Sequence, residues 1–475
     1  MEIVHADQLE YRSAGGVKMR RLSGQVQLRQ GDATLWCQQA DYFMDENRIV
    51  ASGSVHIMQA DTIHAYGDRL QYDGQRRQAR LSGQVRLTDG HMTLHTTDLD
   101  YDLNRREAQY QNGGRVVSSE SVLTSRKARY DLLSYNARFI HQVVLTHPSY
   151  TIFSDSLQLN TESRLCSFIA PTRIVSDSGF IVCSGGHYDL NRETARFTGP
   201  AEMHQNGQQL RADTIDYDRI PGLMLARGHL RWVDSSARIT VTGKAGRYVE
   251  PSGLALVYGQ ALLSTLFEDD SLFIGSDTLL SLTHPQNQSR HLRAYYRVKV
   301  YSDNLQAVCD SLVFSDTDSL FRLYRNPVLW AESYQLSADT MLLEVVNRKI
   351  HRLLLRHNAF AVQSAGPDQY NQAKGRLLTA WFKDGRLDRM HIEGNGESIY
   401  HVYDDARQYI GINRVACGSM VMHFDSSSRV AQIFFLQEPE ATLFPPAQMP
   451  AEERRLRRFD WKADRQPRSK DDLLH

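Results

Sequence analysis

Apolar and polar residues alternate over short stretches along most of the chain. In residues 83–90, Val85 and Leu87 alternate with the polar residues Gln84 and Arg86. A period of two places successive side chains on opposite faces of a β-strand. The pattern therefore predicts strands with one buried face and one solvated face.

Dipeptides that favour tight turns separate these strands. Asp-Gly pairs occur at 73–74 and 89–90, and Asn-Gly pairs occur at 112–113 and 206–207. Both pairs supply the positive φ angles that hairpin turns require. The polar stretches between strands, such as 103–109, show no apolar period of 3.6 residues. The chain is therefore predicted to be all-β.

The strands belong to an internal repeat. The frame Leu-Ser-Gly-Gln-Val-x-Leu occupies 22–28 and 81–87, and 51–57 has a close variant of it. A second marker is an aromatic or apolar residue, often followed by Asp and often preceded by Asp four residues earlier. Steps of 29 to 31 residues separate its positions, which are Tyr11, Tyr42, Tyr72, Tyr101, Tyr130, Leu159, Tyr188, Tyr217 and Tyr248. Such units bury their apolar faces by stacking on one another, which predicts an elongated solenoid.

Three regions follow from the regularity of the repeat. The repeat array is expected to span 1–343, and 344–437 to continue it as a less regular β region. Residues 438–475 are rich in proline and charge. We expect them to form a C-terminal tail with little packing of its own, and a docking segment is the alternative.

Composition and charge narrow the class of protein. The 55 Lys and Arg balance the 55 Asp and Glu, whereas nucleic-acid binders usually carry a basic excess. The chain contains no run of 18 apolar residues, so no membrane-spanning helix is predicted. The five cysteines form no C-x-x-C pair and are interpreted as scattered buried thiols. No signal peptide is visible at the N-terminus.

The sequence offers no motif for catalysis. It contains no H-E-x-x-H, no G-x-S-x-G and no Walker loop. The 18 histidines are spread through the repeats and are interpreted as solvated strand residues. The Asp that precedes the marker, such as Asp68 before Tyr72, recurs with the repeat and is interpreted as structural. We therefore expect no enzyme, no catalytic residue, no metal site and no cofactor.

The recurring apolar face is the informative surface. In a closed solenoid it is a core, whereas in an open solenoid it lines a groove for alkyl chains, which gain about 0.8 kcal/mol for each buried methylene. Periodicity does not separate these two cases. The candidate groove residues are the inward positions of the repeats, namely Val26, Leu28, Val55, Ile57, Val85, Leu87, Met92, Leu94, Ile215 and Leu230.

These motifs resemble the OstA-like family, which includes LptA-type proteins and the N-terminal domain of LptD. The resemblance rests on the frame L-x-G-x-V-x-L followed by Asp-x-x-x-Tyr-Asp at about 29 residues. Longer stretches at 306–314, 324–330, 459–461 and 468–472 also resemble larger OstA-like proteins. The resemblance covers nearly the whole chain, about residues 1–472.

The resemblance implies a β-taco, also called a β-jellyroll, made of stacked antiparallel strands. It implies a non-catalytic periplasmic bridge that carries lipopolysaccharide towards the outer membrane by its acyl chains. The implied partners are other lipopolysaccharide-transport components, joined by addition of edge strands, and further copies of the chain joined end to end. A periplasmic location requires a leader that was removed or is not included in this sequence.

Two other classes of protein remain as alternatives. One is a structural or adhesive β-solenoid of the cell surface, which would have a sealed core and an aromatic exterior. The other is a β-helical polysaccharide enzyme, which would need clustered carboxylates at one level of the solenoid. An apolar, continuous groove would favour the lipid-binding bridge.

Overall fold

The computed structural model describes the chain except residues 15–16, 91, 268–269, 284–288, 384, 405, 407, 446–447 and 475. The described residues form 36 β-strands and four short 3-10 helices, which confirms the predicted all-β class. Two compact units make up the chain: Met1–Asn206 with Asp213–Ile220, and Gly207–Ala212 with Pro221–His475. This division lies elsewhere than the expected boundaries after 343 and 437.

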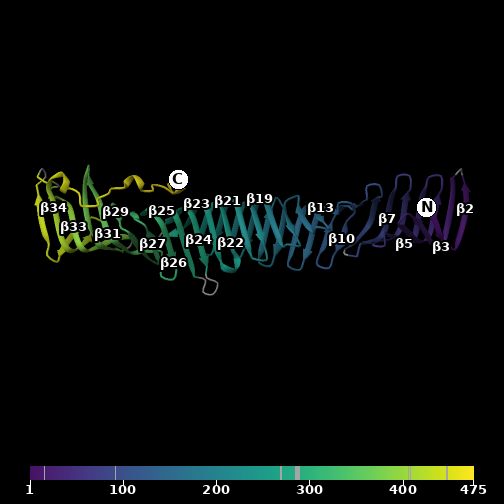
Figure 1. The fold of residues 1–475 in the computed structure, drawn as a ribbon, viewed down its shortest axis with the longest axis horizontal. Coiled ribbons are helices and arrows are strands. Elements are labelled where there is room, and N and C mark those ends of the chain that lie inside the picture. Colours follow the sequence, from purple (N-terminus) through teal and green to yellow (C-terminus); the bar gives the residue numbers. More distant parts are fainter. Residues whose placement is uncertain are drawn as a thin grey trace. The chain divides into compact units, whose positions relative to one another are not determined.

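In the first unit, the strands from β3 (Val17–Gln30) to β8 (Thr93–Asp102) pair antiparallel with their neighbours in sequence (Figure 1). Farther along, the long strands are divided into shorter segments. The strands are β1 (Glu2–His5), β2 (Gln8–Ala14), β3 (Val17–Gln30), β4 (Ala33–Phe43), β5 (Arg48–Gln59), β6 (Ile63–Asp73), β7 (Gln78–Thr88), β8 (Thr93–Asp102), β9 (Glu107–Tyr110), β10 (Gly114–Val117), β11 (Val122–Ser125), β12 (Lys127–Asp131), β13 (Asn136–His147), β14 (Tyr150–Asn160), β15 (Leu165–Phe168), β16 (Thr172–Ser176), β17 (Gly179–Cys183), β18 (Gly185–Asp189) and β19 (Thr194–Gln205).

The division between the units falls within β20 (Gln208–Asp218). The second unit is also antiparallel, with long strands and with shorter segments from β27 to β30. Its elements are β21 (Leu223–Asp234), β22 (Ile239–Val249), η1 (Glu250–Ser252), β23 (Leu254–Phe267), β24 (Asp270–Thr283), β25 (Arg290–Tyr301), β26 (Leu305–Ser315), β27 (Leu320–Tyr324), β28 (Val328–Ala331), β29 (Tyr334–Ser337), β30 (Thr340–Val346), β31 (Lys349–Gly366), β32 (Gln369–Lys383), β33 (Arg386–Tyr403), β34 (Tyr409–Phe424), β35 (Val430–Leu436), β36 (Glu440–Phe444), η2 (Ala451–Glu453), η3 (Ala463–Arg465) and η4 (Lys470–Leu474).

The glycine of the repeat frame lies at a β-bulge in the middle of a strand. In β5, Gly53 has φ of 78° and Ser54 has φ of 49°, and the pairing with β6 shifts between Ser52 and Val55. A bulge adds an unpaired residue and bends its strand. The repeated glycines therefore mark a bend in their strands. We call the two halves of a strand on either side of this bend its arms.

The Asp that precedes the marker tyrosine packs against this bulge. The Oδ2 atom of Asp68 accepts a hydrogen bond of 3.2 Å from the backbone N–H of Gln84. A Cβ atom at Gly83 would lie 2.2 Å from the same oxygen. The two repeat markers thus meet in space, and the structural interpretation of this Asp is confirmed.

We expect Gly83→Ala to destabilise the first unit more than Gly90→Ala. Both glycines have positive φ, at 102° and 89°, so both substitutions carry the conformational cost of roughly 1 kcal/mol for a residue with a side chain. Only the Cβ at residue 83 meets another group, because Gly90 has open space around it. Urea denaturation of the two variants measures the difference. Equal losses in the free energy of unfolding would contradict the assigned packing of Asp68.

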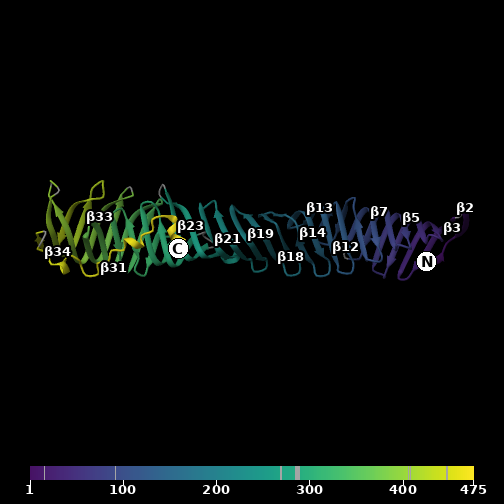
Figure 2. The ribbon, with the colours of Figure 1, turned by 90° about the horizontal axis from the view of Figure 1, so that it is seen from above.

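The C-terminal segment packs on the second unit, so the expectation of little packing is wrong. Met449 and Leu456 are buried in one cluster with Phe360, Val362 and Ile399. Figures 1 and 2 both show this segment running back over the strands of the second unit. We call its described residues from 448 to 474 the C-terminal strap.

Two buried glutamines hold the backbone of the strap. Gln335 donates from Nε2 to the carbonyl oxygen of Asp460 at 2.7 Å and accepts from the N–H of Lys462 at 2.7 Å. The Oε1 atom of Gln372 accepts from the N–H of Leu456 at 2.8 Å. A buried amide without partners would be costly, so these side chains specify where the strap lies.

The end of the strap contacts strands much earlier in the unit. The Lys299 Nζ atom donates to the carbonyl oxygen of Asp472 at 2.7 Å. A Cβ atom at Gly275 would lie 2.7 Å from the carbonyl oxygen of Leu473. The absence of a side chain at Gly275 therefore allows the strap to approach the sheet closely.

All five cysteines lie among the described residues, and each is a buried free thiol, as predicted. Burial raises the pKa of the Cys166 thiol to about 12. Because the thiolate is the reactive form, this cysteine is expected to be inert at neutral pH. No helix in the described ranges is long and apolar enough to cross a membrane.

Candidate functional site

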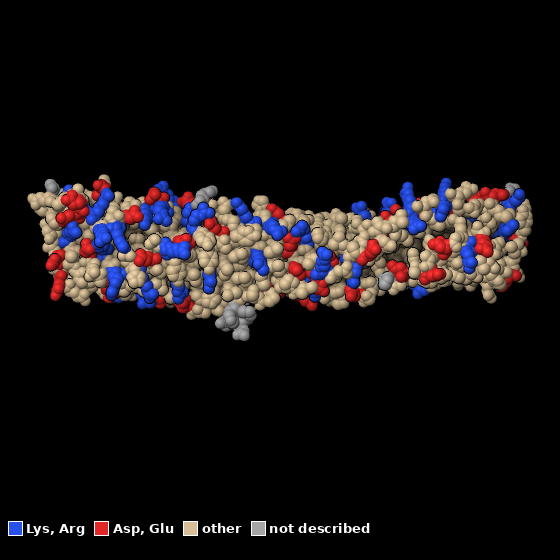
Figure 3. Space-filling model, viewed as in Figure 1, with Lys and Arg blue, Asp and Glu red and all other residues tan. Residues whose placement is uncertain are grey.

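The first unit contains a cavity of about 820 Å³. Its walls come from strands β3 to β14, and most of the lining is apolar. Figure 3 shows a hollow in the surface of this unit, with charged side chains around it. Each strand contributes two arms that meet at the bulge, and the cavity lies between the arms.

One wall is a continuous row of aliphatic side chains. Leu35 pairs with Ile57, Ile57 with Ala65, Ala65 with Leu87, and Leu87 with Leu94. All five line the cavity. They lie on the arms between the bulges and the hairpins. Cross-strand neighbours on one face of a sheet lie about 5 Å apart, so the row presents an unbroken apolar surface.

The other wall alternates between tyrosine and alanine. Tyr72 pairs with Ala79, Ala79 with Tyr101, Tyr101 with Ala108, and Ala108 with Tyr130. These residues also line the cavity. Each alanine has a small side chain and therefore leaves space between two phenol rings. The repeat therefore builds a wall with hollows at regular intervals.

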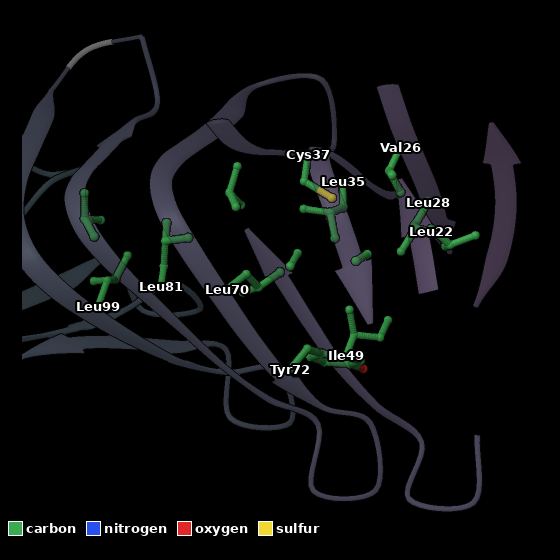
Figure 4. Close-up of a cluster of buried hydrophobic side chains, with 14 of the residues drawn as sticks. Leu22, Val26, Leu28, Leu35, Cys37, Ile49, Leu70, Tyr72, Leu81 and Leu99 are labelled. Atoms are coloured by element: carbon green, nitrogen blue, oxygen red, sulfur yellow. The ribbon is translucent and has the colours of Figure 1, made fainter. Parts of the chain in front are cut away.

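In the interior of the same unit, leucines lie on the strands between the tyrosine wall and the bulges. Leu70, Leu81 and Leu99 lie on three successive strands, and Tyr72 lies beside Ile49 (Figure 4). All five contribute to the cavity lining. The interior of the first unit is thus partly a packed core and partly an empty groove.

The candidate groove residues take three different positions. Leu28, Ile57, Leu87, Met92 and Leu94 line the cavity. Val26, Val55 and Val85 are buried next to the bulges in the core and do not contribute to its lining. Ile215 in the first unit and Leu230 in the second unit are buried away from the cavity.

The tyrosine and alanine wall was missed as part of the site. In the sequence, the tyrosines stand out only as markers of the period. The available signal was an alanine seven residues after a marker, at Ala79 after Tyr72 and at Ala108 after Tyr101. Such an alanine pairs with that tyrosine across the intervening turn.

Where an Asp follows a marker tyrosine of this wall, it shapes the turn at the rim. The Oδ1 atom of Asp73 accepts from the N–H groups of Gln75 at 3.0 Å and Arg76 at 2.9 Å. Asp102 repeats this arrangement one unit later, and its backbone hydrogen bonds lower the pKa of its carboxyl group. The turns end at Arg77 and Arg106, which have φ of 56° and 53°. Both arginines line the cavity.

The phenol hydroxyls along the wall differ in their partners. Tyr130 hydrogen-bonds to the hydroxyl of Thr161 at 3.1 Å, and burial raises the pKa of Tyr130. The hydroxyl of Tyr72 is buried and has no hydrogen-bond partner among the described residues. Burial also raises the pKa of Tyr101, and the charge of the nearby Arg106 opposes this shift.

The lining of the cavity is mainly apolar. Of the described residues that line the cavity, none is His, Lys or Cys. The described part of the chain also has no group of three or more His, Cys, Asp or Glu that could hold a metal ion. The walls offer mainly alkyl and aromatic contacts.

Comparison with known proteins finds one family match, over part of the chain. Residues 1–155 match the family described as OstA-like protein. This match agrees with the repeat motifs and confirms the predicted resemblance to OstA-like proteins over 155 of the 475 residues. No curated protein matches the chain.

Two solved structures show weaker likeness. One is LptH, the LptA-homologous periplasmic component of the lipopolysaccharide transport device of Pseudomonas aeruginosa. It is 14% identical, with 22% of this chain and 79% of that chain covered, at a TM-score of 0.21. The other is the WD40 domain of SCAP from fission yeast, which is 10% identical, with 88% and 97% covered, at a TM-score of 0.10. Neither likeness carries an argument about this chain.

Proposed function

We propose that the chain is a non-catalytic periplasmic bridge that binds lipopolysaccharide by its acyl chains and carries it towards the outer membrane. The cavity between the aliphatic row and the tyrosine wall carries this proposal. Its lining is apolar over several successive strands, as an extended alkyl chain requires. The OstA-like match over residues 1–155 covers most of the lining residues and supports the same class of ligand.

The energetics suit an acyl ligand. Burying twelve methylene groups would contribute on the order of 10 kcal/mol before the costs of ordering and association are subtracted. The wall alanines, such as Ala79 and Ala108, leave the room that such a chain needs. A sealed solenoid would instead fill this volume with larger side chains, since protein interiors are close-packed.

The proposed partners follow from the role of a bridge. Other lipopolysaccharide-transport components would join the chain through addition of edge strands, and further copies of the chain would join end to end. Backbone N–H and C=O groups at an exposed sheet edge are the chemical basis of this association.

Co-elution of the purified chain with lipopolysaccharide tests the proposal. We expect intact lipopolysaccharide to co-elute on size exclusion below its micellar concentration, and de-acylated lipopolysaccharide to elute separately. Equal retention of the de-acylated form would favour a carbohydrate-binding surface protein. Retention of neither form would favour a sealed structural solenoid.

A further inference from the structure

We infer that the rim of the cavity recognises an oxyanion, either phosphate or carboxylate, on the head group of the bound amphiphile. Arg77 and Arg106, at the ends of the turns that follow Tyr72 and Tyr101, would bind it. This inference rests on the proposed function, because it assigns the polar end of the ligand whose alkyl chain fills the cavity.

Local structure brings the two arginines to the same rim. Each arginine follows a turn that is capped by the Asp after the marker tyrosine. The carbonyl oxygen of Arg77 accepts from the N–H of Leu103 at 3.0 Å, and that of Arg106 accepts from the N–H of Leu132 at 3.0 Å. These bonds stack successive turns, so the two arginines occupy equivalent places in adjacent repeats. Arg77 and Arg106 are two strand spacings apart in the sheet, which is about 10 Å.

Both guanidinium groups are available for a ligand. Among the described residues, neither Arg77 nor Arg106 forms an ion pair or a side-chain hydrogen bond, and both are exposed. By contrast, Arg164, in the equivalent place farther along, pairs with Glu120 at 3.2 Å and does not line the cavity. The unpaired arginines thus belong to the repeats that border the cavity.

The marker tyrosines give a second, independent indication. Tyr42 donates to Oδ1 of Asn47 at 3.5 Å, and Tyr130 is bonded to Thr161. The hydroxyls of Tyr72 and Tyr101 have no partner in the described part of the chain, and that of Tyr72 is buried. A buried hydroxyl without a partner costs roughly 1–3 kcal/mol. These two tyrosines belong to the same repeats as the unpaired arginines Arg77 and Arg106.

The opposite rim carries acids that are already engaged in their hairpins. Asp32 Oδ2 accepts from Nε2 of Gln59 at 3.5 Å, and Asp89 Oδ1 accepts from the N–H of Met92 at 2.8 Å. Of the charged residues that line the cavity, Arg77 and Arg106 lie on the tyrosine side and Asp32 and Asp89 on the opposite side, while Asp73 and Asp102 on the tyrosine side are engaged in capping their turns. A negatively charged head group is expected to settle on the tyrosine side.

The donor set suits an oxyanion. A guanidinium group presents several N–H donors in a planar fork that matches the oxygens of phosphate and carboxylate. Phenol hydroxyls can add O–H donors to the same oxygens. An alkyl chain in the groove would hold the head group at the mouth, which raises its effective concentration there.

Binding of matched amphiphiles tests this inference. The probes are dodecyl phosphate, dodecanoate and neutral dodecyl maltoside, measured by calorimetry below their micellar concentrations. We expect Arg77→Gln with Arg106→Gln to weaken the anionic probes at least tenfold more than it weakens dodecyl maltoside. A larger loss for dodecyl phosphate than for dodecanoate would identify phosphate as the preferred anion, and the reverse would identify carboxylate.

The matched control is Arg76→Gln with Arg105→Gln. These arginines lie one residue away in the same turns, are exposed and do not line the cavity. The control removes the same charge, so we expect it to change anion binding less than twofold. An equal loss in both double variants, or none in the first, would overturn the oxyanion site. Failure of all three probes to bind the unmodified chain would instead overturn the proposed lipid groove.

Discussion

Replacing Leu456 by aspartate is expected to lower the free energy of unfolding of the second unit by about 3–5 kcal/mol. Leu456 is 3% exposed and packs in one cluster with Phe360, Val362 and Ile399. The substitution removes apolar contacts and places a charge in an apolar site. It also disturbs the hydrogen bond that Gln372 accepts from the backbone N–H of residue 456.

Denaturation followed by tryptophan fluorescence measures this effect, because Trp330 and Trp461 lie in the second unit. The matched control is Leu436→Asp, which changes a leucine that is 44% exposed in the same unit. We expect the control to change stability by less than about 1 kcal/mol. If both variants unfold at the same denaturant concentration, the strap does not contribute to the stability of the second unit.

Replacing Ile57 by lysine is expected to weaken binding of dodecyl maltoside at least tenfold, or about 1.4 kcal/mol. Ile57 lies in the middle of the aliphatic row, between Leu35 and Ala65. An ammonium group there would have to lose water whenever an alkyl chain enters the groove. The neutral head group of the probe keeps this effect separate from any charge at the rim.

The control for this variant is Gln71→Lys. Gln71 lies on β6 next to Tyr72, is exposed and faces away from the cavity. We expect it to bind the probe as the unmodified chain does, and we expect both variants to keep the same circular dichroism spectrum. Unchanged binding by a folded Ile57→Lys variant would mean that alkyl chains do not use this row.

The strands, the repeat and the resemblance to OstA-like proteins could be predicted because these depend on local patterns. The alternation around Val85 and the turn after Asp73 are set within a few residues. The pairing of Asp68 with the bulge at Gly83 was harder to see, because it joins two markers that lie 15 residues apart. A recurring acid and a recurring glycine gave the period without showing that they touch.

The strap and the tyrosine wall could not be predicted in the same way. Leu456 and Trp461 lie in a segment without any period, and their partners, such as Phe360, are about a hundred residues away. The cavity depends on which inward residues are small. Ala79 and Tyr72 both fit an inward position, and only their pairing across strands shows that a hollow results.

Photocrosslinking in cells that make lipopolysaccharide tests the central claim most directly. A photoreactive amino acid would replace Ile57 or Leu87, which line the cavity, or the outward-facing Arg86 as the control. We expect lipopolysaccharide adducts at Ile57 and Leu87 and none at Arg86. Folded protein without adducts at either cavity position would contradict the lipid groove.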